Sequence, residues 1–206
     1  MKIVTFKIDD KEIKTAEGTT ILEAAKKAGV EIPTLCYLEG LEPYGACRVC
    51  SVEIEIRGRT RIVAACCYPV EEGLKVVTRS PKIDKIRKTI IELAAVMAGE
   101  DIAGEMRALA SEYNADLSRF RTRLPMEPTK CILCGICVRR CIEACWDSAI
   151  GFVGRGVNRR VVLYPEKAGT CAICSYCQRV CPTGRISSIG PDPPFPYVDD
   201  VLSGRK

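Results

Sequence analysis

Two cysteine runs with identical spacing constrain this chain more than any other feature. In each run three cysteines stand two residues apart and a fourth follows after three more residues, C-x2-C-x2-C-x3-C. The runs are Cys131, Cys134, Cys137 and Cys141, and Cys171, Cys174, Cys177 and Cys181. Three thiolates at this interval let a short loop curl around one corner of an iron–sulfur cube, while the fourth stands on the helical turn that follows. The two runs therefore predict two [4Fe–4S] clusters.

Zinc and disulfides explain the same cysteines less well. Structural zinc prefers two separate C-x2-4-C knuckles and often recruits histidine, whereas this chain has 14 cysteines and no histidine. Disulfides belong mainly to small secreted scaffolds, which neither run resembles. Iron–sulfur ligation is favoured over both, and over a set of merely buried thiols.

The second run ends in Cys181-Pro182 and resembles bacterial two-cluster ferredoxins. In that family the fourth cysteine of each run ligates the cluster held by the other run. The resemblance implies that one cube is held by Cys131, Cys134, Cys137 and Cys181, and the other by Cys171, Cys174, Cys177 and Cys141. Cys145 is then expected to be a spare thiol, although a slip in helix register would make it a competing ligand.

This region also departs from a minimal ferredoxin. Ile142 replaces the proline that would follow the first run, and 29 residues separate Cys141 from Cys171. Within this insert, residues 149–154 and 159–164 predict a β-hairpin about Gly156-Val157-Asn158. The nearby glycines do not form G-x-G-x-x-G, so we expect no nucleotide site there.

The N-terminal region alternates apolar and polar residues and predicts a small sheet with one helix. Thr20 and Glu23 form a capping box that starts the helix, and Gly29 stops it. The expected elements are strands at 2–8, 11–15, 51–57, 60–65 and 74–78 and a helix at 21–28. A hairpin, a helix, a cysteine loop and a second hairpin, in this order, predict a β-grasp domain, the fold of plant-type ferredoxins.

Cys36, Cys47 and Cys50 occupy the loop of this domain with the spacing C-x10-C-x2-C, and Cys66 and Cys67 follow. This spacing resembles that of the cysteines in the N-terminal [2Fe–2S] domain of the large iron–sulfur subunit of complex I. The flanking segments resemble that domain as well: PTLCY, GACRVCSVE and ACCYPVEEG. The same domain occurs in NAD-linked hydrogenases and formate dehydrogenases. The family's fourth ligand stands three residues before a proline, so the resemblance implies a [2Fe–2S] cluster on Cys36, Cys47, Cys50 and Cys66, with Cys67 as a spare.

The middle of the chain predicts two helices. Ser80-Pro81 starts the first and Gly99 ends it. Its apolar stripe, read as core, is Ile83, Ile86, Ile90, Leu93, Ala94 and Met97. The second is expected from Asp101 to Tyr113. Residues 79–130 contain neither cysteine nor histidine, so the histidine-plus-three-cysteine motif of complex I is absent, and the nearer resemblance is to a shorter diaphorase-type subunit.

Composition limits the remaining possibilities. The net charge is only +5 and aromatic residues make up 6%, so nucleic-acid binding is not expected. No signal segment and no apolar run near the length of a membrane span is visible, and we expect a cytoplasmic protein. Basic residues gather either as a solvated face or as a docking surface for an acidic partner: Arg119, Arg121, Arg123, Arg139, Arg140, Arg155, Arg159 and Arg160. Arg48 is either a solvated surface arginine or a group that stabilises the reduced [2Fe–2S] cluster.

The overall prediction is an α+β chain with four parts. These are a β-grasp [2Fe–2S] domain (1–79), a helical connector (80–128), a two-[4Fe–4S] ferredoxin domain with a hairpin insert (129–190) and a proline-rich tail (191–206). The tail is not expected to form a regular element, and is either disordered or laid across a partner.

The resemblance implies a non-catalytic electron-transfer subunit of a hetero-oligomeric complex. Such a subunit relays single electrons between a flavin-bearing, NAD(P)H-oxidising diaphorase subunit and a catalytic subunit of the hydrogenase or formate dehydrogenase type. It leaves open whether the complex bifurcates electrons. The alternatives are a free-standing multi-cluster carrier and a redox-sensing binding module.

Overall fold

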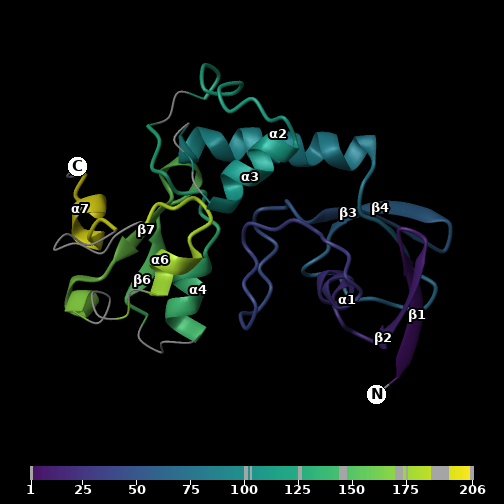
Figure 1. Cartoon of the computed structure of the whole chain (residues 1–206). Helices are drawn as coiled ribbons and strands as arrows, with labels where there is room; N and C mark the ends of the chain where they lie inside the picture. Colours follow the sequence, from purple (N-terminus) through teal and green to yellow (C-terminus); the bar gives the residue numbers. More distant parts are fainter. Residues whose placement is uncertain are drawn as a thin grey trace.

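The first part of the chain forms a five-stranded mixed sheet, shown at the right of Figure 1. In the spatial order β2-β1-β5-β3-β4, β1 pairs in parallel with β5 and all other neighbours are antiparallel. The strands are β1 Ile3–Ile8, β2 Lys11–Ala16, β3 Ser51–Ile56, β4 Arg59–Ala64 and β5 Lys75–Val77. Both predicted hairpins and the short closing strand are confirmed.

Helix α1 (Ile21–Lys27) packs on this sheet and begins at the predicted capping box. The Thr20 side chain accepts the backbone N–H of Glu23 at 3.2 Å, and the Glu23 carboxylate accepts the N–H of Thr20 at the same distance. Its apolar face joins the buried strand residues of the sheet in one core. A mixed sheet with one packed helix confirms the α+β class and agrees with the expected β-grasp arrangement.

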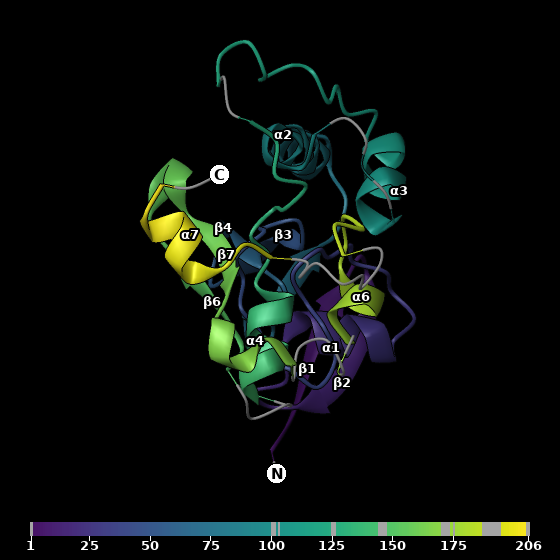
Figure 2. The same ribbon diagram turned by 90° about the vertical axis from the view of Figure 1, so that its left-hand side faces the viewer.

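The computed structural model describes residues 2–99, 102, 104–124, 127–143, 148–169, 174, 176–186 and 195–204. In these ranges the connector consists of α2 (Pro81–Ala98) and α3 (Gly104–Glu112). The Ser80 side chain caps α2 by accepting the N–H of Ile83, as predicted. Helix α2 lies across the top of Figure 1, and Figure 2 views it end-on with α3 beside it. The predicted start of the second helix, Asp101, lies outside the described residues.

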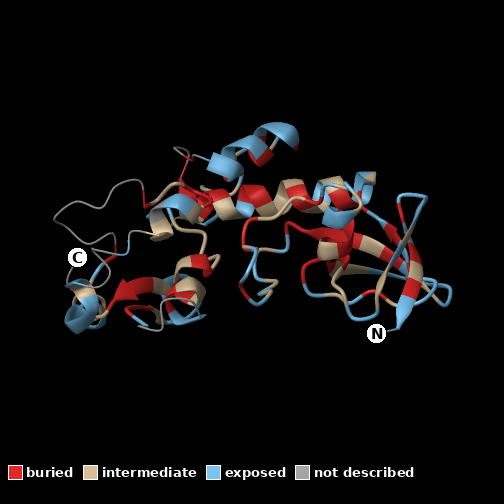
Figure 3. Cartoon of the chain, turned by 60° about the horizontal axis from the view of Figure 1, so that its bottom comes forward, coloured by how far each residue is buried: buried red, intermediate tan, exposed pale blue. Residues whose placement is uncertain are grey.

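The buried face of α2 differs from the predicted apolar stripe. Leu93 is 43% exposed and Ile86 and Ile90 are only partly buried, whereas the fully buried row includes Arg87. That row consists of residues about four apart: Ile83, Arg87, Ile91, Ala95 and Ala98. Figure 3 shows buried residues recurring along the helix. The apolar members of this row pack inward, and Arg87 is accommodated among them because its guanidinium finds hydrogen-bond acceptors there.

The C-terminal part packs two short helices against a β-hairpin, at the left of Figure 1. The hairpin pairs β6 with β7 in antiparallel register, as predicted. The elements in chain order are α4 Ile136–Glu143, β6 Ile150–Val153, the 3₁₀ turn Gly156–Asn158, β7 Arg160–Leu163, the 3₁₀ turn Pro165–Lys167, α6 Tyr176–Val180 and α7 Val198–Leu202.

The end of the chain is more ordered than expected. The prediction that this tail forms no regular element is wrong for residues 195–204, which include α7. Phe195 is 2% exposed within the apolar core of the C-terminal part. The N–H of Leu163 donates to the carbonyl oxygen of Pro196 at 3.0 Å, so the tail continues the edge of β7. One buried aromatic ring and one strand-like hydrogen bond anchor an otherwise proline-rich segment.

Among the helices that the structure describes, none is both long enough and apolar enough to cross a bilayer.

Candidate iron–sulfur sites

The four N-terminal cysteines meet as two pairs. Cys36, Cys47 and Cys50 lie in the loop between α1 and β3, and Cys66 follows β4. The N–H of Cys47 donates to Cys36 Sγ at 3.4 Å, and the Sγ atoms of Cys50 and Cys66 are 3.5 Å apart. Two sulfurs bound to one tetrahedral metal lie about 3.8 Å apart. Because each iron of a [2Fe–2S] cluster takes two thiolates, two close pairs fit its ligand set.

The electrostatics of these pairs favour one thiolate in each. The pKa of Cys36 is lowered to about 6, first by the thiol of Cys47 and also by backbone N–H groups and the charge of Arg139. The pKa of Cys50 is lowered to about 7, chiefly by the thiol of Cys66. The pKa values of Cys47 and Cys66 rise because each donates its proton to the neighbouring sulfur and is buried.

Cys66 and Cys67 differ sharply in environment. Cys66 is buried and faces Cys50, whereas Cys67 is exposed and its Sγ lies 3.5 Å from that of Cys66. Gly45, at a φ of 62°, passes so close that an added Cβ would lie 2.9 Å from Cys67 Sγ. This geometry supports Cys66 over Cys67 as the fourth ligand.

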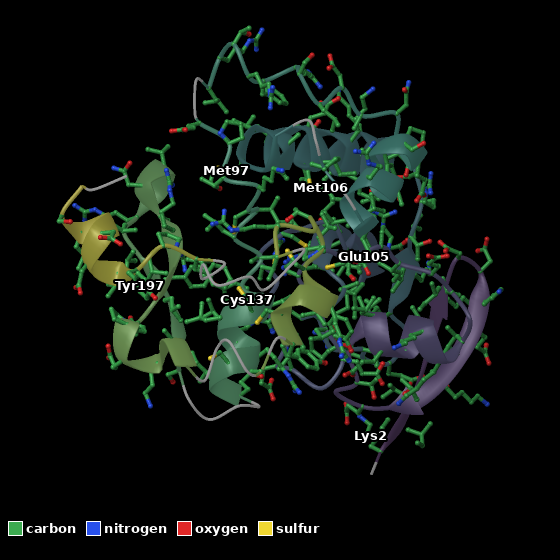
Figure 4. All side chains as sticks on the ribbon, turned by 60° about the vertical axis from the view of Figure 1, so that its left-hand side comes forward. Lys2, Met97, Glu105, Met106, Cys137 and Tyr197 are labelled. Carbon is green, nitrogen blue, oxygen red and sulfur yellow. The ribbon has the colours of Figure 1, made fainter. Side chains whose placement is uncertain are left out.

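Four cysteines of the proposed first cube line one cavity in the C-terminal part. Three come from the loop leading into α4 and from its first turn, and one directly follows α6: Cys131, Cys134, Cys137 and Cys181. The N–H of Leu133 donates to Cys131 Sγ at 3.4 Å. Figure 4 shows Cys137 at the start of α4, close to α6. Cys177 of α6 lines the same cavity.

Burial opposes ionisation of these thiols. It raises the pKa of Cys134 to about 12 and that of Cys137 well above its usual value, and the negative charges of neighbouring cysteines add to both effects. Buried thiols crowded in this way become thiolates when cations compensate their charge. The cluster of thiols therefore fits a polynuclear iron site.

The second proposed cube is described only in part. Cys141 is buried and its Sγ accepts the N–H of Ala149 at 3.2 Å. Cys141 and Cys177 belong to the same apolar core, while Cys174 is exposed. The fourth proposed ligand, Cys171, and the possible competitor, Cys145, lie outside the described residues.

Within the described ranges, no three cysteine or carboxylate side chains converge closely enough to hold a single metal ion. An iron–sulfur cluster spreads its irons and requires only one or two thiolates at each iron. The close pairs Cys36 with Cys47 and Cys50 with Cys66 fit this demand.

The two cysteine regions meet at a shared interface that sequence reasoning did not identify. Arg139 of α4 donates from Nη2 to the carbonyl oxygen of Cys36 at 2.7 Å and also donates to the carbonyl oxygen of Glu42. In return, the N–H of Glu42 donates to the carboxylate of Glu143 at 3.0 Å. Ile132, between two cysteines of the first run, packs on the core that includes Leu35 and Val49. The cysteine loop of the N-terminal sheet is therefore held directly against the start of the other cysteine region.

Close packing reinforces this interface. The guanidinium of Arg139 lies 5.2 Å from the ring centre of Tyr44. An added Cβ on Gly135, which has a φ of 76°, would lie 3.3 Å from that ring. In the sequence Arg139 stands two residues after Cys137, which marks it as close to a proposed ligand but gives no sign of its contact with Cys36.

Comparison with known proteins agrees with the cysteine geometry. A family model described as "2Fe-2S iron-sulfur cluster binding domain" matches residues 1–81. The protein is therefore an iron–sulfur protein with an N-terminal 2Fe–2S domain.

Longer matches define the family. The chain is 38% identical over 205 residues to the NADPH-Fe(3+) oxidoreductase subunit alpha of Geobacter sulfurreducens, covering 90% of this chain and 24% of that protein. It is 33% identical over 217 residues to the NADP-reducing hydrogenase subunit HndD of Solidesulfovibrio fructosivorans, covering 90% and 36%. A solved structure of an NAD+-reducing [NiFe]-hydrogenase matches at 30% identity and a TM-score of 0.67, covering 87% of this chain and 79% of that one.

The chain belongs to the family of iron–sulfur electron-transfer subunits found in NAD(P)-linked oxidoreductases and hydrogenases. It spans about a quarter of the length of the first curated relatives that it matches.

Proposed function

We propose that this chain is a three-cluster relay within a hetero-oligomeric NAD(P)-linked complex. Cys36, Cys47, Cys50 and Cys66 would hold a [2Fe–2S] cluster. One [4Fe–4S] cluster would be held by Cys131, Cys134, Cys137 and Cys181, and the other by Cys171, Cys174, Cys177 and Cys141. When bound, the clusters supply reversible one-electron transfer, while the protein sets their potentials and separation.

The observation that carries this proposal is the hydrogen bond from Arg139 to Cys36. It joins the carbonyl group of one proposed cluster ligand to a residue two positions after another ligand, Cys137. Ile132 and Cys47 also pack on the same apolar core. This contact fits a direct electron hop between the two cluster regions, in place of the histidine–cysteine cluster that residues 79–130 cannot supply.

The proposed partner subunits are inferred from the similarity of the chain to subunits of NAD(P)-linked complexes. We place a flavin-bearing, NAD(P)H-oxidising subunit at one end of the relay and a catalytic subunit of the hydrogenase or formate dehydrogenase type at the other. The similarity to an NAD+-reducing hydrogenase structure supports the first of these types. In this assignment the chain moves electrons and its partners carry out the bond-making chemistry.

Anaerobic iron and acid-labile sulfide analysis tests the cluster content. About ten iron atoms per chain are expected from one two-iron and two four-iron clusters. Electron paramagnetic resonance of the reduced protein should resolve one [2Fe–2S] signal and signals of [4Fe–4S] centres. A count near two or four iron atoms, or zinc in place of iron, would contradict the proposal.

Native purification separates a bound relay from a free carrier or sensor. The protein should elute from size exclusion of an anaerobic native extract together with flavin and NAD(P)H-oxidising activity. Elution as a cluster-loaded monomer without these companions would favour the free-standing carrier.

A further inference from the structure

Arg87 is a completely buried cation beside the proposed [2Fe–2S] ligands. It lies on α2, has 0% exposure and uses all three of its nitrogen positions. Nε donates to the carbonyl oxygen of Val49 at 3.1 Å, and Nη2 donates to that of Ser51 at 2.9 Å. These two carbonyls flank Cys50, so the guanidinium straddles the backbone of a proposed cluster ligand.

The remaining contacts of Arg87 are neutral. Nη1 donates to the hydroxyl of Tyr113 at 3.0 Å, and the guanidinium lies 5.8 Å from the centre of that ring. Across the part of the chain that the structure describes, no carboxylate lies within ion-pair distance of Arg87. The buried Glu92, just over one turn further along α2, is instead engaged by Arg119 and by the N–H of Asp116.

The other charged side chains near Arg87 form ion pairs with one another at the protein surface. Arg79 lies 4.9 Å from the centre of the Tyr113 ring and pairs with Glu112 and Asp84. Arg79 is itself a cation, and the carboxylates of Glu112 and Asp84 are paired with it. These three side chains therefore do not neutralise the charge of Arg87. A buried charge without an opposite charge is strongly unfavourable, and hydrogen bonds to neutral groups compensate only part of the cost.

The proposed cluster supplies the missing negative charge. Two ferric ions, two sulfides and four thiolates carry two net negative charges, and a one-electron reduction adds a third. A fixed buried cation interacts more favourably with the reduced state than with the oxidised state, because the reduced state carries more negative charge.

We propose that Arg87 is the buried counter-charge of the [2Fe–2S] cluster and that it raises the reduction potential of that cluster. This inference rests on the ligand assignment of the proposed function. We favour Arg87 over Arg48 in this role, because Arg48 is exposed and its charge is screened by water and salt. Arg87 acts as a positioning and potential-setting residue and ligates no iron.

The test compares charge with hydrogen bonding at one position. Arg87→Gln keeps an amide donor but removes the charge, whereas Arg87→Lys keeps the charge but loses the planar fork. Arg79→Gln is the matched control, because it removes a half-exposed cation from beside the same tyrosine ring. Each protein is loaded with clusters anaerobically, checked for iron and sulfide, and titrated while the [2Fe–2S] signal is followed by electron paramagnetic resonance.

Arg87→Gln should shift the midpoint potential to more negative values. Arg87→Lys at neutral pH should stay nearer to wild type than Arg87→Gln does, and Arg79→Gln should match wild type. Fully loaded Arg87→Gln with a wild-type midpoint would overturn the inference, as would a shift in Arg87→Lys as large as that in Arg87→Gln. A wild-type chain without a [2Fe–2S] cluster would instead refute the proposed function.

A second measurement covers the case in which Arg87→Gln fails to retain its cluster. A buried lysine loses its proton more readily than arginine, so the potential in Arg87→Lys should fall relative to wild type as pH rises from about 6 to about 11. The same pH profile in both proteins would overturn the inference.

Discussion

The guanidinium of Arg139 lies 2.7 Å from the carbonyl oxygen of Cys36, although 103 positions separate the two residues in the sequence. This hydrogen bond connects helix α4 of the C-terminal part to the cysteine loop of the N-terminal sheet. The same side chain reaches the Glu42 carbonyl, so one residue fixes two points of that loop. The relative placement of the two cysteine regions depends on few groups, and each can be tested.

Arg139→Met should loosen this loop without disturbing either core. It removes two hydrogen bonds from a charged donor and keeps most of the aliphatic stem, at a cost of about 1–3 kcal/mol. Hydrogen exchange at the amides of Glu42 and Cys47 should accelerate by about tenfold to a hundredfold. Arg140→Met is the control, because Arg140 stacks on Tyr176 within the C-terminal part. Unchanged exchange in Arg139→Met would show that the loop is held by other contacts.

Cys66→Ala and Cys67→Ala should have opposite outcomes. Cys66 is buried against Cys50, so its loss should abolish the [2Fe–2S] signal and lower the iron count by about two per chain. Cys67→Ala should retain both the signal and the iron. A signal that survives in Cys66→Ala and disappears only in the double variant would mean that Cys67 can take over as ligand.

Loss of Arg119 should destabilise the protein, because its ion-pair partner Glu92 is buried. The Glu92 side chain is 0% exposed and that of Arg119 is 51% exposed, with 2.6 Å between Oε2 and Nη1. Within the described part of the chain, Arg119→Met leaves a buried carboxylate with only the Asp116 N–H as partner, and should cost about 1–3 kcal/mol. Adding Glu92→Gln should recover part of this loss, measured as protection of the Asp116 amide. Equal protection in the single and double variants would contradict this.

Phe195→Ala should release the end of the chain locally. Replacing a buried phenylalanine with alanine costs about 3–5 kcal/mol, and Phe195 is the one fully buried residue of 195–204. Limited proteolysis should then cut this segment faster while the N-terminal sheet stays intact. Leu202→Ala is the matched control, since Leu202 is 72% exposed. Equal cutting of both variants would mean that Phe195 does not anchor the tail.

Local patterns in the sequence were sufficient for many of the regular elements, although not for α7. Strand alternation located both N-terminal hairpins and the insert hairpin, and the cap residues Thr20 and Ser80 located two helix starts. Cysteine spacing, together with the family resemblance that favoured Cys66 over Cys67, also identified thiols that the fold brings together, as with Cys50 and Cys66. Signals of this kind depend on residues close in sequence or on strict ligand geometry.

The error on α2 arose because polar groups decide which face of that helix is buried. The stripe predicted for α2 counted only apolar residues, and therefore missed that Arg87 and Glu92 are buried by backbone and ion-pair partners. The spacing of four from Ile83 through Arg87 to Ile91 was present in the sequence. The contact between Arg139 and Cys36 could not be predicted from the sequence, because the acceptor is a backbone carbonyl and every residue type has one.

The parallel pairing of β1 with β5 has a consequence for the order of assembly. The strand that begins the chain at Ile3 acquires its second neighbour only after Lys75–Val77 has been synthesised. Cys66, the last of the four proposed ligands, precedes that segment. All four thiols are therefore synthesised before the strand that gives β1 its second neighbour, so the loop that would hold the cluster is complete before the sheet can close.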